Sequence, residues 1–524
     1  MKRRDFCKGL AVTFAAGTLA PAAALPQAGA ATALVGRAVP DDYYTLWYRS
    51  DRCGADLRHD YYYSDSLFDH PATEYDNQLA LATLGMAAAA DCPWESDQRY
   101  WMEGEVGRAD HIRDAFAKLG FTEVQLFNYT HSLNDTPDTV GCAIARKTLV
   151  RGGRQVTIIG AFLRGSGYGA EWSGNLHAGP GSAHVGFVTA ARQLVEKIRA
   201  YVQASAKRQP LGTLKLWMGG YSRGGGVANL VAARLPAVLP QLEKKNTFVY
   251  TFAAPASLTA ADCPDLQQDY DNNHAADGRL KKDWGTSNIF NIVSSGDVIP
   301  RILPAEWGFY RNGNDRFLPS TVIPEELQAL NDRSAGMEGT PMDFGRLAVT
   351  EEADAVLRSM LDLFCDRQTY YKGYEDAMRC MLQCATTRTE EEVTQGIVRD
   401  DAAVVAQLRS MELMRRFPQE KLERCVQAAS ALSRPVLEKL GSAVPLQAQQ
   451  IVIPMLAVGL CFELQPETVQ LVADFVLSTI TVKGQLSGIL KTVLCHFQEN
   501  YITVLEAYDP ADHGMTPYTR REEL

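Results

Sequence analysis

The chain has 524 residues, a net charge of −10 and a globular composition, with 46% hydrophobic and 22% charged residues. At about 150 residues per domain, this length predicts roughly three domains. The acidic balance and the lack of a lysine- and arginine-rich run argue against nucleic acid as a partner, and the composition argues against a low-complexity chain.

The first 30 residues have the pattern of a signal peptide. Lys2, Arg3 and Arg4 precede an apolar stretch at 10–20, and small residues typical of a cleavage site follow. The arginine pair also resembles the twin-arginine signal, whose substrates are exported in the folded state. We therefore expect export to the extracellular space or the cell envelope. No later stretch reaches the roughly 18 consecutive apolar residues of a transmembrane helix.

A predicted buried strand at 156–162 ends in a glycine loop that contains Ser166. Glycines let backbone N–H groups approach a small bound anion. The loop has neither a Walker pattern nor the dinucleotide-binding fingerprint, so a phosphate-binding loop is not expected here. The backbone N–H groups of this loop are instead candidate donors to an oxyanion.

The pattern Gly-X-Ser-X-Gly occurs at residues 220–224. Apolar residues alternate at 214–218, as in a strand, and recur at helical spacing after the pattern as far as Leu235. A serine at a sharp strand-to-helix turn exposes its hydroxyl above the sheet. Ser222 is therefore the predicted nucleophile, and the backbone N–H of Arg223 is the second predicted oxyanion donor. The alternative is a glycine-rich turn that merely contains a serine.

A serine nucleophile needs a base and a group that orients the base. Two further strands are predicted at 246–257 and 289–293, and Asp297 follows the second of them. A carboxylate just past the carboxyl end of a strand is placed for function in open α/β sheets. Asp297 is therefore the predicted orienting group, and a turn-capping aspartate is the alternative.

Only two of the nine histidines, His496 and His513, follow Asp297. The order serine, acid, histidine is that of α/β hydrolases. His513 lies in a polar tail of the kind that is usually mobile. His496 is therefore the predicted general base, and a core histidine with a structural role is the alternative.

About 200 residues separate Asp297 from His496, whereas a connection in an α/β unit has about 2–6. Apolar stripes at helical spacing predict helices in this stretch. The stripes are Val356, Met360 and Leu363; Val404, Leu408 and Met411; and Leu422, Cys425, Val426 and Ala429, the last of them ending near Pro435. We expect a helical insert or cap, whose apolar side chains pack mainly against one another.

Eleven cysteines are present, and Cys7 would be removed with the signal peptide. The ten that remain are too few for a disulfide scaffold in so long a chain, so most are expected to be core thiols. Cys380 and Cys384 lie one helical turn apart, but no second pair or histidine completes a zinc site. Neither a metal nor a cofactor is expected.

The chain resembles the class 3, fungal-type lipases of the α/β-hydrolase superfamily, and in particular an exported bacterial branch. The resemblance rests on blocks at residues 162–172, 184–187, 220–224, 250–255, 297–301 and 496–501. It implies Ser222, Asp297 and His496 as the catalytic triad. It also implies the backbone N–H groups of Ser166 and Arg223 as the oxyanion donors, the Ser166 hydroxyl as a helper, and a structural role for His184. The chain departs from the family pattern at two places, which leave the predicted chemistry intact but bear on which substrate the site accepts. Tyr221 and Arg223 stand where the fungal elbow has histidine and leucine, and the block around Pro255 lacks the usual glycine and arginine.

The predicted organisation is a signal peptide at 1–30, an α/β-hydrolase core at 41–320, a helical insert at 321–484, a segment at 485–510 that completes the core, and a tail at 511–524. The expected function is hydrolysis of acylglycerols or related lipid esters through an acyl-enzyme, with transient contact with a lipid interface. A phospholipase, an esterase for soluble esters and a non-catalytic surface-binding protein of the same fold are the alternatives.

Overall fold

The computed structural model divides the chain into two compact units, residues 1–34 and 35–524, and every described residue belongs to the second. The described residues are 38–50, 56–91, 104–105, 109–131, 138–166, 171, 174–175, 177–179, 183–259, 286–294, 296–303, 309–318, 351, 353–355, 357–358, 375–386, 392, 395–440, 446–464, 492 and 495–507. The predicted signal peptide and C-terminal tail lie outside this set.

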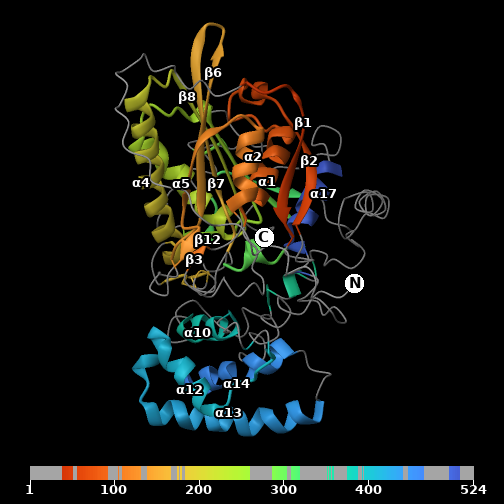
Figure 1. Cartoon of the computed structure of the whole chain (residues 1–524), viewed down its shortest axis with the longest axis vertical. Coiled ribbons are helices and arrows are strands. Elements are labelled where there is room, and N and C mark those ends of the chain that lie inside the picture. The colour runs from red at the N-terminus through yellow and green to blue at the C-terminus, as the bar shows by residue number, and fades with distance from the viewer. Residues whose placement is uncertain are drawn as a thin grey trace, which may run out of the picture. The chain divides into compact units, whose positions relative to one another are not determined.

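A seven-stranded mixed sheet organises the first part of the described chain (Figure 1). Its order is β13-β11-β9-β8-β7-β6-β4, parallel from β13 to β7 and antiparallel from there to β4. The bounds are β4 Thr122–Phe127, β6 Cys142–Arg151, β7 Arg154–Leu163, β8 Thr213–Tyr221, β9 Thr247–Phe252, β11 Ile289–Ser294 and β13 Asn314–Leu318. This mixed sheet flanked by helices confirms the predicted α/β-hydrolase class of fold.

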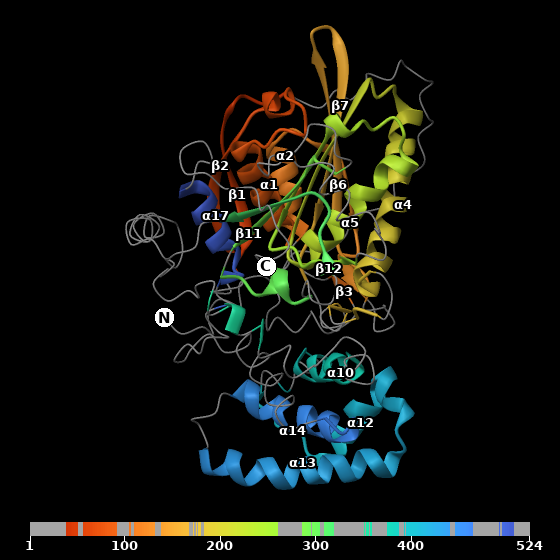
Figure 2. The same ribbon diagram turned by 180° about the vertical axis from the view of Figure 1, so that it is seen from behind.

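Helices cover both faces of the sheet (Figures 1 and 2). On one face, α4 (Val185–Arg208) and α5 (Arg223–Val238) share an apolar core with the strands. On the other face, a second core joins the strands to α1 (Asn77–Ala90), α2 (Ala109–Lys118) and α17 (Gln498–Ala507). The burial of both faces explains why the central strands read as continuous apolar runs.

A hairpin of β1 (Asp42–Arg49) and β2 (Asp56–Tyr63) packs on α1 and α2. The remaining short elements of the described core are η1 Asp65–Phe68, β3 Gly104–Glu105, β5 Thr130–His131, η3 Lys244–Asn246, β10 Leu258–Thr259, η4 Ile299–Arg301 and β12 Phe309–Tyr310. Helix α1 is rich in alanine and is capped at its start by Asp76, whose side chain accepts from the N–H of Leu79 at 2.8 Å. Such an N-cap satisfies a donor that the helix itself leaves unpaired.

The strand predicted at 246–257 is shorter in the structure, since β9 ends at Phe252. Ala253 has φ +52°, a left-handed conformation that interrupts an extended chain. Its N–H still donates to the carbonyl of Ile292 in β11 at 3.1 Å, but the paired register of β9 with β8 and with β11 ends at Phe252. The prediction is therefore wrong for its last five residues and for Asn246, which lies in η3.

Helices also occur between Asp297 and His496. They are α10 Glu375–Thr386, α12 Asp401–Ser410, η8 Glu412–Arg416, α13 Gln419–Leu440 and α14 Leu446–Cys461, and they share an apolar core of their own. The predicted stripe at 404–411 lies in α12 except for Met411, the residue that follows the helix, and the stripe at 422–429 lies in α13. The stripe residues Val356, Met360 and Leu363 lie outside the described residues. That these helices form an insert or cap over the core stays a prediction.

The predicted end of the third stripe near Pro435 is wrong, because α13 continues to Leu440 with Pro435 inside it. Proline in a helix interior removes one hydrogen bond and costs about 3 kcal/mol. Packing of α13 against α14 and α12 outweighs this local cost. Here the tertiary structure overrides the preference of a single residue.

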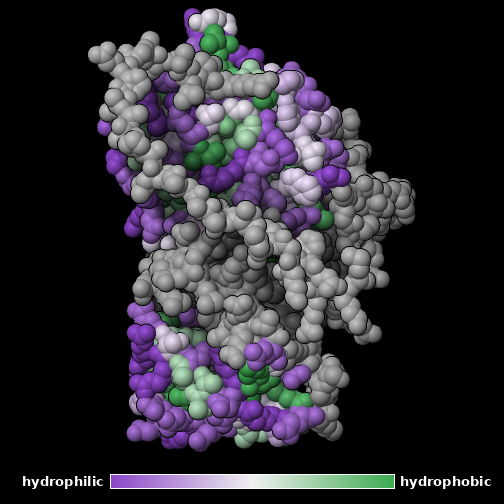
Figure 3. Space-filling model, in the orientation of Figure 1, coloured by the Kyte–Doolittle hydropathy of each residue, from purple (hydrophilic) through white to green (hydrophobic). Residues whose placement is uncertain are grey.

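None of the described helices is long and apolar enough to span a membrane. The described part of the face in Figure 3 is mainly hydrophilic, with apolar residues scattered over it. Among the large apolar side chains, Tyr43, Val150 and Leu432 are 64–66% exposed. They lie on β1, β6 and α13, three separate elements.

Candidate active site

Ser222 lies at the sharp turn between β8 and α5. It has φ +52° and ψ −123°, a conformation that costs a residue with a side chain about 1–3 kcal/mol. Gly220 and Gly224 face each other across the turn, since a Cβ on Gly220 would lie 2.4 Å from the carbonyl oxygen of Gly224. Only glycine permits this approach. The residues predicted as a nucleophile elbow therefore form one.

Three side chains from distant parts of the sequence form a line of hydrogen bonds. Ser222 Oγ lies 2.9 Å from His496 Nε2, and His496 Nδ1 lies 2.8 Å from Asp297 Oδ2. Asp297 is fully buried, whereas the side chain of His496 is 18% exposed. A neutral imidazole that donates from Nδ1 to Asp297 can accept the serine proton at Nε2. This is the geometry of a nucleophile with an oriented general base.

The Asp297 carboxylate is held by donors in addition to the histidine. Its Oδ1 accepts from the N–H of Ile299 at 2.9 Å, and its Oδ2 accepts from the hydroxyl of Tyr501 at 2.8 Å. The Tyr501 oxygen in turn accepts from the N–H of Ser294 at 3.0 Å. Burial, with the nearby Asp297 charge, raises the pKa of Tyr501 well above 10. The phenol therefore stays protonated and keeps donating to the carboxylate.

His496 occupies the turn that leads into α17, and its backbone is fixed by two side chains. The Tyr221 hydroxyl donates to the His496 carbonyl, and Asn500 Nδ2 donates to the carbonyl of Cys495 at 3.0 Å. The rings of Tyr221 and His496 have centroids 5.5 Å apart. Tyr221 is the residue before the nucleophile, so its contacts connect the elbow directly to the turn that carries His496.

The two predicted oxyanion donors belong to adjacent segments. Ser166 follows the carboxyl end of β7, which pairs with β8, and Arg223 is the first residue of α5. A Cβ on Gly224 would lie 2.4 Å from the carbonyl oxygen of Arg164, so the start of α5 lies against the end of β7. The first N–H groups of a helix have no partner within it. They are suited to bind negative charge.

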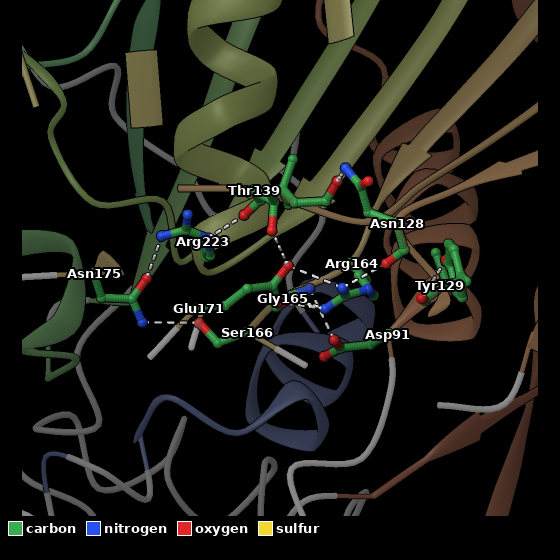
Figure 4. A network of polar contacts seen from close by, with 12 residues as sticks. Asp91, Asn128, Tyr129, Thr139, Arg164, Gly165, Ser166, Glu171, Asn175 and Arg223 are labelled. Carbon is green, nitrogen blue, oxygen red and sulfur yellow. Dashed lines mark hydrogen bonds and ion pairs between the residues drawn. The ribbon is translucent and has the colours of Figure 1, made fainter. Parts of the chain in front are cut away.

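One polar side chain, which the sequence analysis did not identify, connects these two residues (Figure 4). Asn175 Nδ2 donates to Ser166 Oγ at 2.8 Å, and Arg223 Nη1 donates to Asn175 Oδ1 at 2.8 Å. Arg223 Nε donates to the carbonyl of Thr139 at 2.9 Å. The guanidinium group also lies 5.1 Å from the ring centre of Phe187. Arg223 is therefore a buried, fully oriented side chain beside the nucleophile.

A buried ion pair fixes the strand end that carries Ser166. Arg164 Nη1 and Nη2 donate to the two carboxylate oxygens of Glu171 at 2.6 and 2.9 Å, and both side chains are fully buried. Arg164 Nη2 also donates to the carbonyl of Asn128 at 2.7 Å. The bidentate pair and the further acceptor fix both the position and the orientation of the Arg164 guanidinium group, and so of the strand end beside it.

Asp91, the C-cap of α1, joins the Ser166 loop to the histidine helix. Its Oδ1 accepts from the N–H of Gly165 at 2.8 Å, and its Oδ2 accepts from the side-chain amide of Gln498. Gly165 precedes Ser166, and Gln498 is the first residue of α17. A single carboxylate therefore links two parts of the site that are far apart in sequence.

His184 has a structural role in this geometry, as the family resemblance implies. It is the N-cap of α4, where Nδ1 accepts from the N–H of Phe187 at 3.2 Å and Nε2 faces the carbonyl of Asn175 at 2.9 Å. Burial lowers the pKa of His184 to about 3. The ring is therefore neutral and donates from Nε2, which fixes the backbone of Asn175.

No group of three or more metal-ligating side chains occurs among the described residues. Their six cysteines, which include Cys380 and Cys384, are free thiols. The roles of Asn175, Asp91 and Tyr501 were not predicted from the sequence. Of these, only Tyr501 stood in a block that carried the family resemblance.

The fold and this line of side chains define a serine hydrolase of the α/β-hydrolase class. Residues 165–307 match the family model "Lipase (class 3)". The segment contains Ser222 and Asp297 but ends before His496. No curated protein sequence matches the chain.

Among solved structures, the chain is similar to a triacylglycerol lipase described as having a serine protease triad, at 20% identity and a TM-score of 0.31, over 46% of this chain and 79% of that one. It is also similar to the Rhizomucor miehei lipase–propeptide complex, at 20% identity and a TM-score of 0.30. This match covers 46% of this chain and 68% of that one. A lipase from Rhizopus microsporus var. chinensis is similar at 17% identity and a TM-score of 0.30, over 47% of this chain and 76% of that one. Each likeness covers less than half of this chain.

Proposed function

We propose that this lipase hydrolyses acylglycerols or related lipid esters through an acyl-enzyme on Ser222. The observation that carries the proposal is the contact of Ser222 Oγ with His496 Nε2 at 2.9 Å, continued to Asp297 at 2.8 Å. The match of residues 165–307 to the class 3 lipase family supports a lipid ester as the substrate.

In the first half-reaction, Ser222 Oγ attacks the ester carbonyl carbon while His496 Nε2 takes the serine proton. The negative charge that develops on the carbonyl oxygen is stabilised by the backbone N–H groups of Ser166 and Arg223. Collapse of the tetrahedral intermediate breaks the ester C–O bond. His496 then returns the proton to the leaving alcohol, and the acyl group stays on Ser222.

In the second half-reaction, His496 takes a proton from water as the water oxygen attacks the acyl-enzyme carbonyl. The same donors stabilise the second intermediate. Its collapse breaks the bond between the acyl carbon and Ser222 Oγ and releases the fatty acid, while His496 returns its proton to Ser222 Oγ. Asp297 stays ionised and stabilises the imidazolium that forms in both steps. Every proton is thus accounted for without a cofactor.

Hydrolysis of p-nitrophenyl butyrate and palmitate by the protein and by Ser222→Ala tests the proposal. Removal of the serine is expected to lower kcat by about a million-fold, and a fluorophosphonate probe is expected to label only the wild type. Equal rates in the two proteins would contradict the proposal. The expected result makes Ser222 the nucleophile rather than a turn residue.

The substrate class is tested with emulsified triacylglycerol and phosphatidylcholine vesicles supplied at equal molar ester concentration. Release of fatty acid from triacylglycerol above its solubility limit supports an acylglycerol lipase. Activity on phosphatidylcholine alone would make the enzyme a phospholipase, and activity on soluble short-chain esters alone would make it an esterase.

Export through the N-terminal segment is also part of this proposal. Its support is the order of basic, apolar and small residues in the sequence, with Arg3 and Arg4 as the arginine pair. Residues 1–30 fused to a reporter are expected to direct export, and replacement of both arginines by lysine is expected to abolish a twin-arginine route. Retention of the wild-type fusion inside the cell would contradict the proposal.

A further inference from the structure

We propose that Cys425 and Cys461 form a site of reversible oxidation, at which a low-molecular-weight disulfide converts their two thiols into one disulfide that links α13 to α14. Neither helix carries a residue of the triad. The inference therefore goes beyond ester hydrolysis and does not depend on it. It starts from the free thiols of the helices between Asp297 and His496.

Four cysteines contribute to the apolar core that these helices share. Cys380, Cys384 and Cys461 are at most 1% exposed, whereas Cys425 is half-buried and packs against this core. Cys425 lies in the apolar stripe of α13, and Cys461 is the last residue of α14. A hydrogen bond joins the thiol groups of Cys425 and Cys461. These two thiols are therefore in contact across the boundary between two helices.

Further contacts hold the start of α13 against the end of α14. Lys421 Nζ, one turn before Cys425, lies 2.9 Å from Glu463 Oε1, just beyond the end of α14. The rings of Phe417 and Phe462 meet edge to face, with centroids 5.0 Å apart. Both views of the ribbon show α13 and α14 side by side (Figures 1 and 2). The contact between the thiols is thus part of a packed pair of helices.

Burial gives the two thiols different roles. Burial, and after it the neighbouring Cys425 thiol, raises the pKa of Cys461 well above its usual range, and the Lys421 ammonium group opposes this shift. The thiolate is the attacking species in thiol–disulfide exchange. Cys461 therefore stays protonated, and the half-buried Cys425 is the thiol that meets a reagent from the solvent.

The oxidation proceeds in two exchange steps. Cys425 Sγ, as its thiolate, attacks one sulfur of the reagent, which forms a mixed disulfide and releases the first reagent thiolate. Cys461 Sγ then attacks Cys425 Sγ, passes its proton to the solvent and releases the second reagent thiolate. One reagent disulfide is thus reduced to two thiols while two protein thiols are oxidised to one disulfide. Because the protein thiols are already in contact, rotation about their Cα–Cβ bonds brings the sulfurs to the bond length of about 2 Å.

Glutathione disulfide is the probe that tests this site. The full-length protein is purified with a reductant, freed of it and incubated with the probe, and the remaining thiols are blocked with iodoacetamide before digestion with trypsin. We expect peptide 425–439 to be linked to peptide 440–483, since each contains a single cysteine. The linked form is expected to exceed the glutathione adduct of Cys425 by about 10-fold or more, because the second thiol is held in place.

Cys461→Ala is the most direct variant, because it removes only the second step. It is expected to stop the reaction at the mixed disulfide of Cys425 with glutathione, whereas Cys425→Ala is expected to form neither product. Cys384→Ala removes another buried thiol of the same core and is the matched control. It is expected to leave the linked peptides unchanged. Dithiothreitol is expected to restore both thiols in the wild type.

Free thiols at both positions after treatment of the folded wild type overturn the inference. A persistent glutathione adduct in the wild type also overturns it, as does a link from Cys461 to peptide 380–388 in place of peptide 425–439. Far-UV circular dichroism shows whether each variant is folded. Oxidation is expected to raise the thermal unfolding midpoint of the wild type by about 3–5 °C and to leave that of Cys461→Ala unchanged.

Ser222→Ala separates this inference from the proposed function. The variant is expected to form the same linked peptides as the wild type, because its substitution lies in another part of the fold. An inactive wild type that still forms the link overturns the proposed function alone. An active wild type that fails to form it overturns only the oxidation site.

Discussion

At the scale of single residues, Tyr501 shares an acceptor with the histidine. Asp297 Oδ2 accepts from both His496 Nδ1 and the Tyr501 hydroxyl, each at 2.8 Å. A buried carboxylate depends strongly on such donors, since a hydrogen bond to a charged group contributes about 1.5–3 kcal/mol. The phenol therefore orients the oxygen on which the histidine depends.

Tyr501→Phe is expected to lower kcat about 10-fold, equal to about 1.4 kcal/mol in the barrier, with little change in KM. The reason is that Oδ2 loses the donor that fixes it beside His496. Tyr61→Phe is the matched control, because its hydroxyl is buried yet has no hydrogen-bond partner among the described residues. Steady-state kinetics on a soluble ester measure both variants. Equal losses in the two would contradict an orienting role for Tyr501.

Sequence patterns contain enough information to propose Ser222, Asp297 and His496 but not the residues that support them. Ser222 has a local signature in its flanking glycines, and the chain order then limits the choice of acid and base. Asn175 has no local signature, because its importance comes from contacts with Ser166 and Arg223 that exist only in the folded chain. Pattern reading identifies reactive groups far better than the groups that orient them.

At the scale of elements, Asp91 connects three of them: the end of α1, the loop after β7 and the first turn of α17. Gln498, which donates to Asp91, has an unpartnered amide oxygen, Oε1, among the described residues. Rotation of this amide would present Oε1 to a donor at position 91. The neutral amide of asparagine could therefore replace the carboxylate.

We expect Asp91→Asn to keep kcat within about 3-fold and Asp91→Ala to lower it by about 10-fold or more, on the scale of one to two lost hydrogen bonds. In Asp91→Asn, Oδ1 still accepts from Gly165, and Nδ2 donates to the rotated Gln498. In Asp91→Ala, the loop and the helix lose their common acceptor. Kinetics combined with chemical denaturation test this pair. A severe loss in Asp91→Asn would show that the charge, rather than the hydrogen bonds, is required.

Element boundaries were harder to predict from sequence than the elements themselves. The central strands and the helix after Ser222 were identified, but β9 ends at Phe252 because Ala253 takes a left-handed conformation. Helix α13 passes through Pro435 because its neighbours hold it. In both cases the deciding contact lies outside the local window, so no local pattern could reveal it.

At the scale of the whole molecule, the buried and neutral His184 makes the fold sensitive to acid. Its pKa is about 3 in the folded protein, against about 6.5 in an unfolded chain. Between these values the unfolded state binds more protons, so the stability contributed by this group falls as the pH falls. The stability that His184 contributes is complete above the pKa of histidine in the unfolded chain, and it declines as the pH falls below that pKa.

As the pH is lowered from 6 to 4, the contribution of His184 to the free energy of unfolding is expected to fall by about 1.4 kcal/mol per pH unit. His184→Asn retains a side-chain acceptor for the N-cap of α4 and does not titrate there. Urea denaturation at pH 7, 6 and 5 is expected to give a shallower pH dependence for the variant than for the wild type. Parallel curves for the two proteins would contradict the assignment.

The two ends of the described core meet in space, since Asn77 at the start of α1 donates to the carbonyl of Leu505 in α17, 428 positions later. His496 follows Asp297 by 199 positions. At about 5–20 residues per second, a ribosome takes roughly 10–40 s to cover that distance. During this time the growing chain has its nucleophile and its carboxylate but lacks its base. A serine hydrolase built in this order has no complete triad until the histidine segment has been synthesised and has docked.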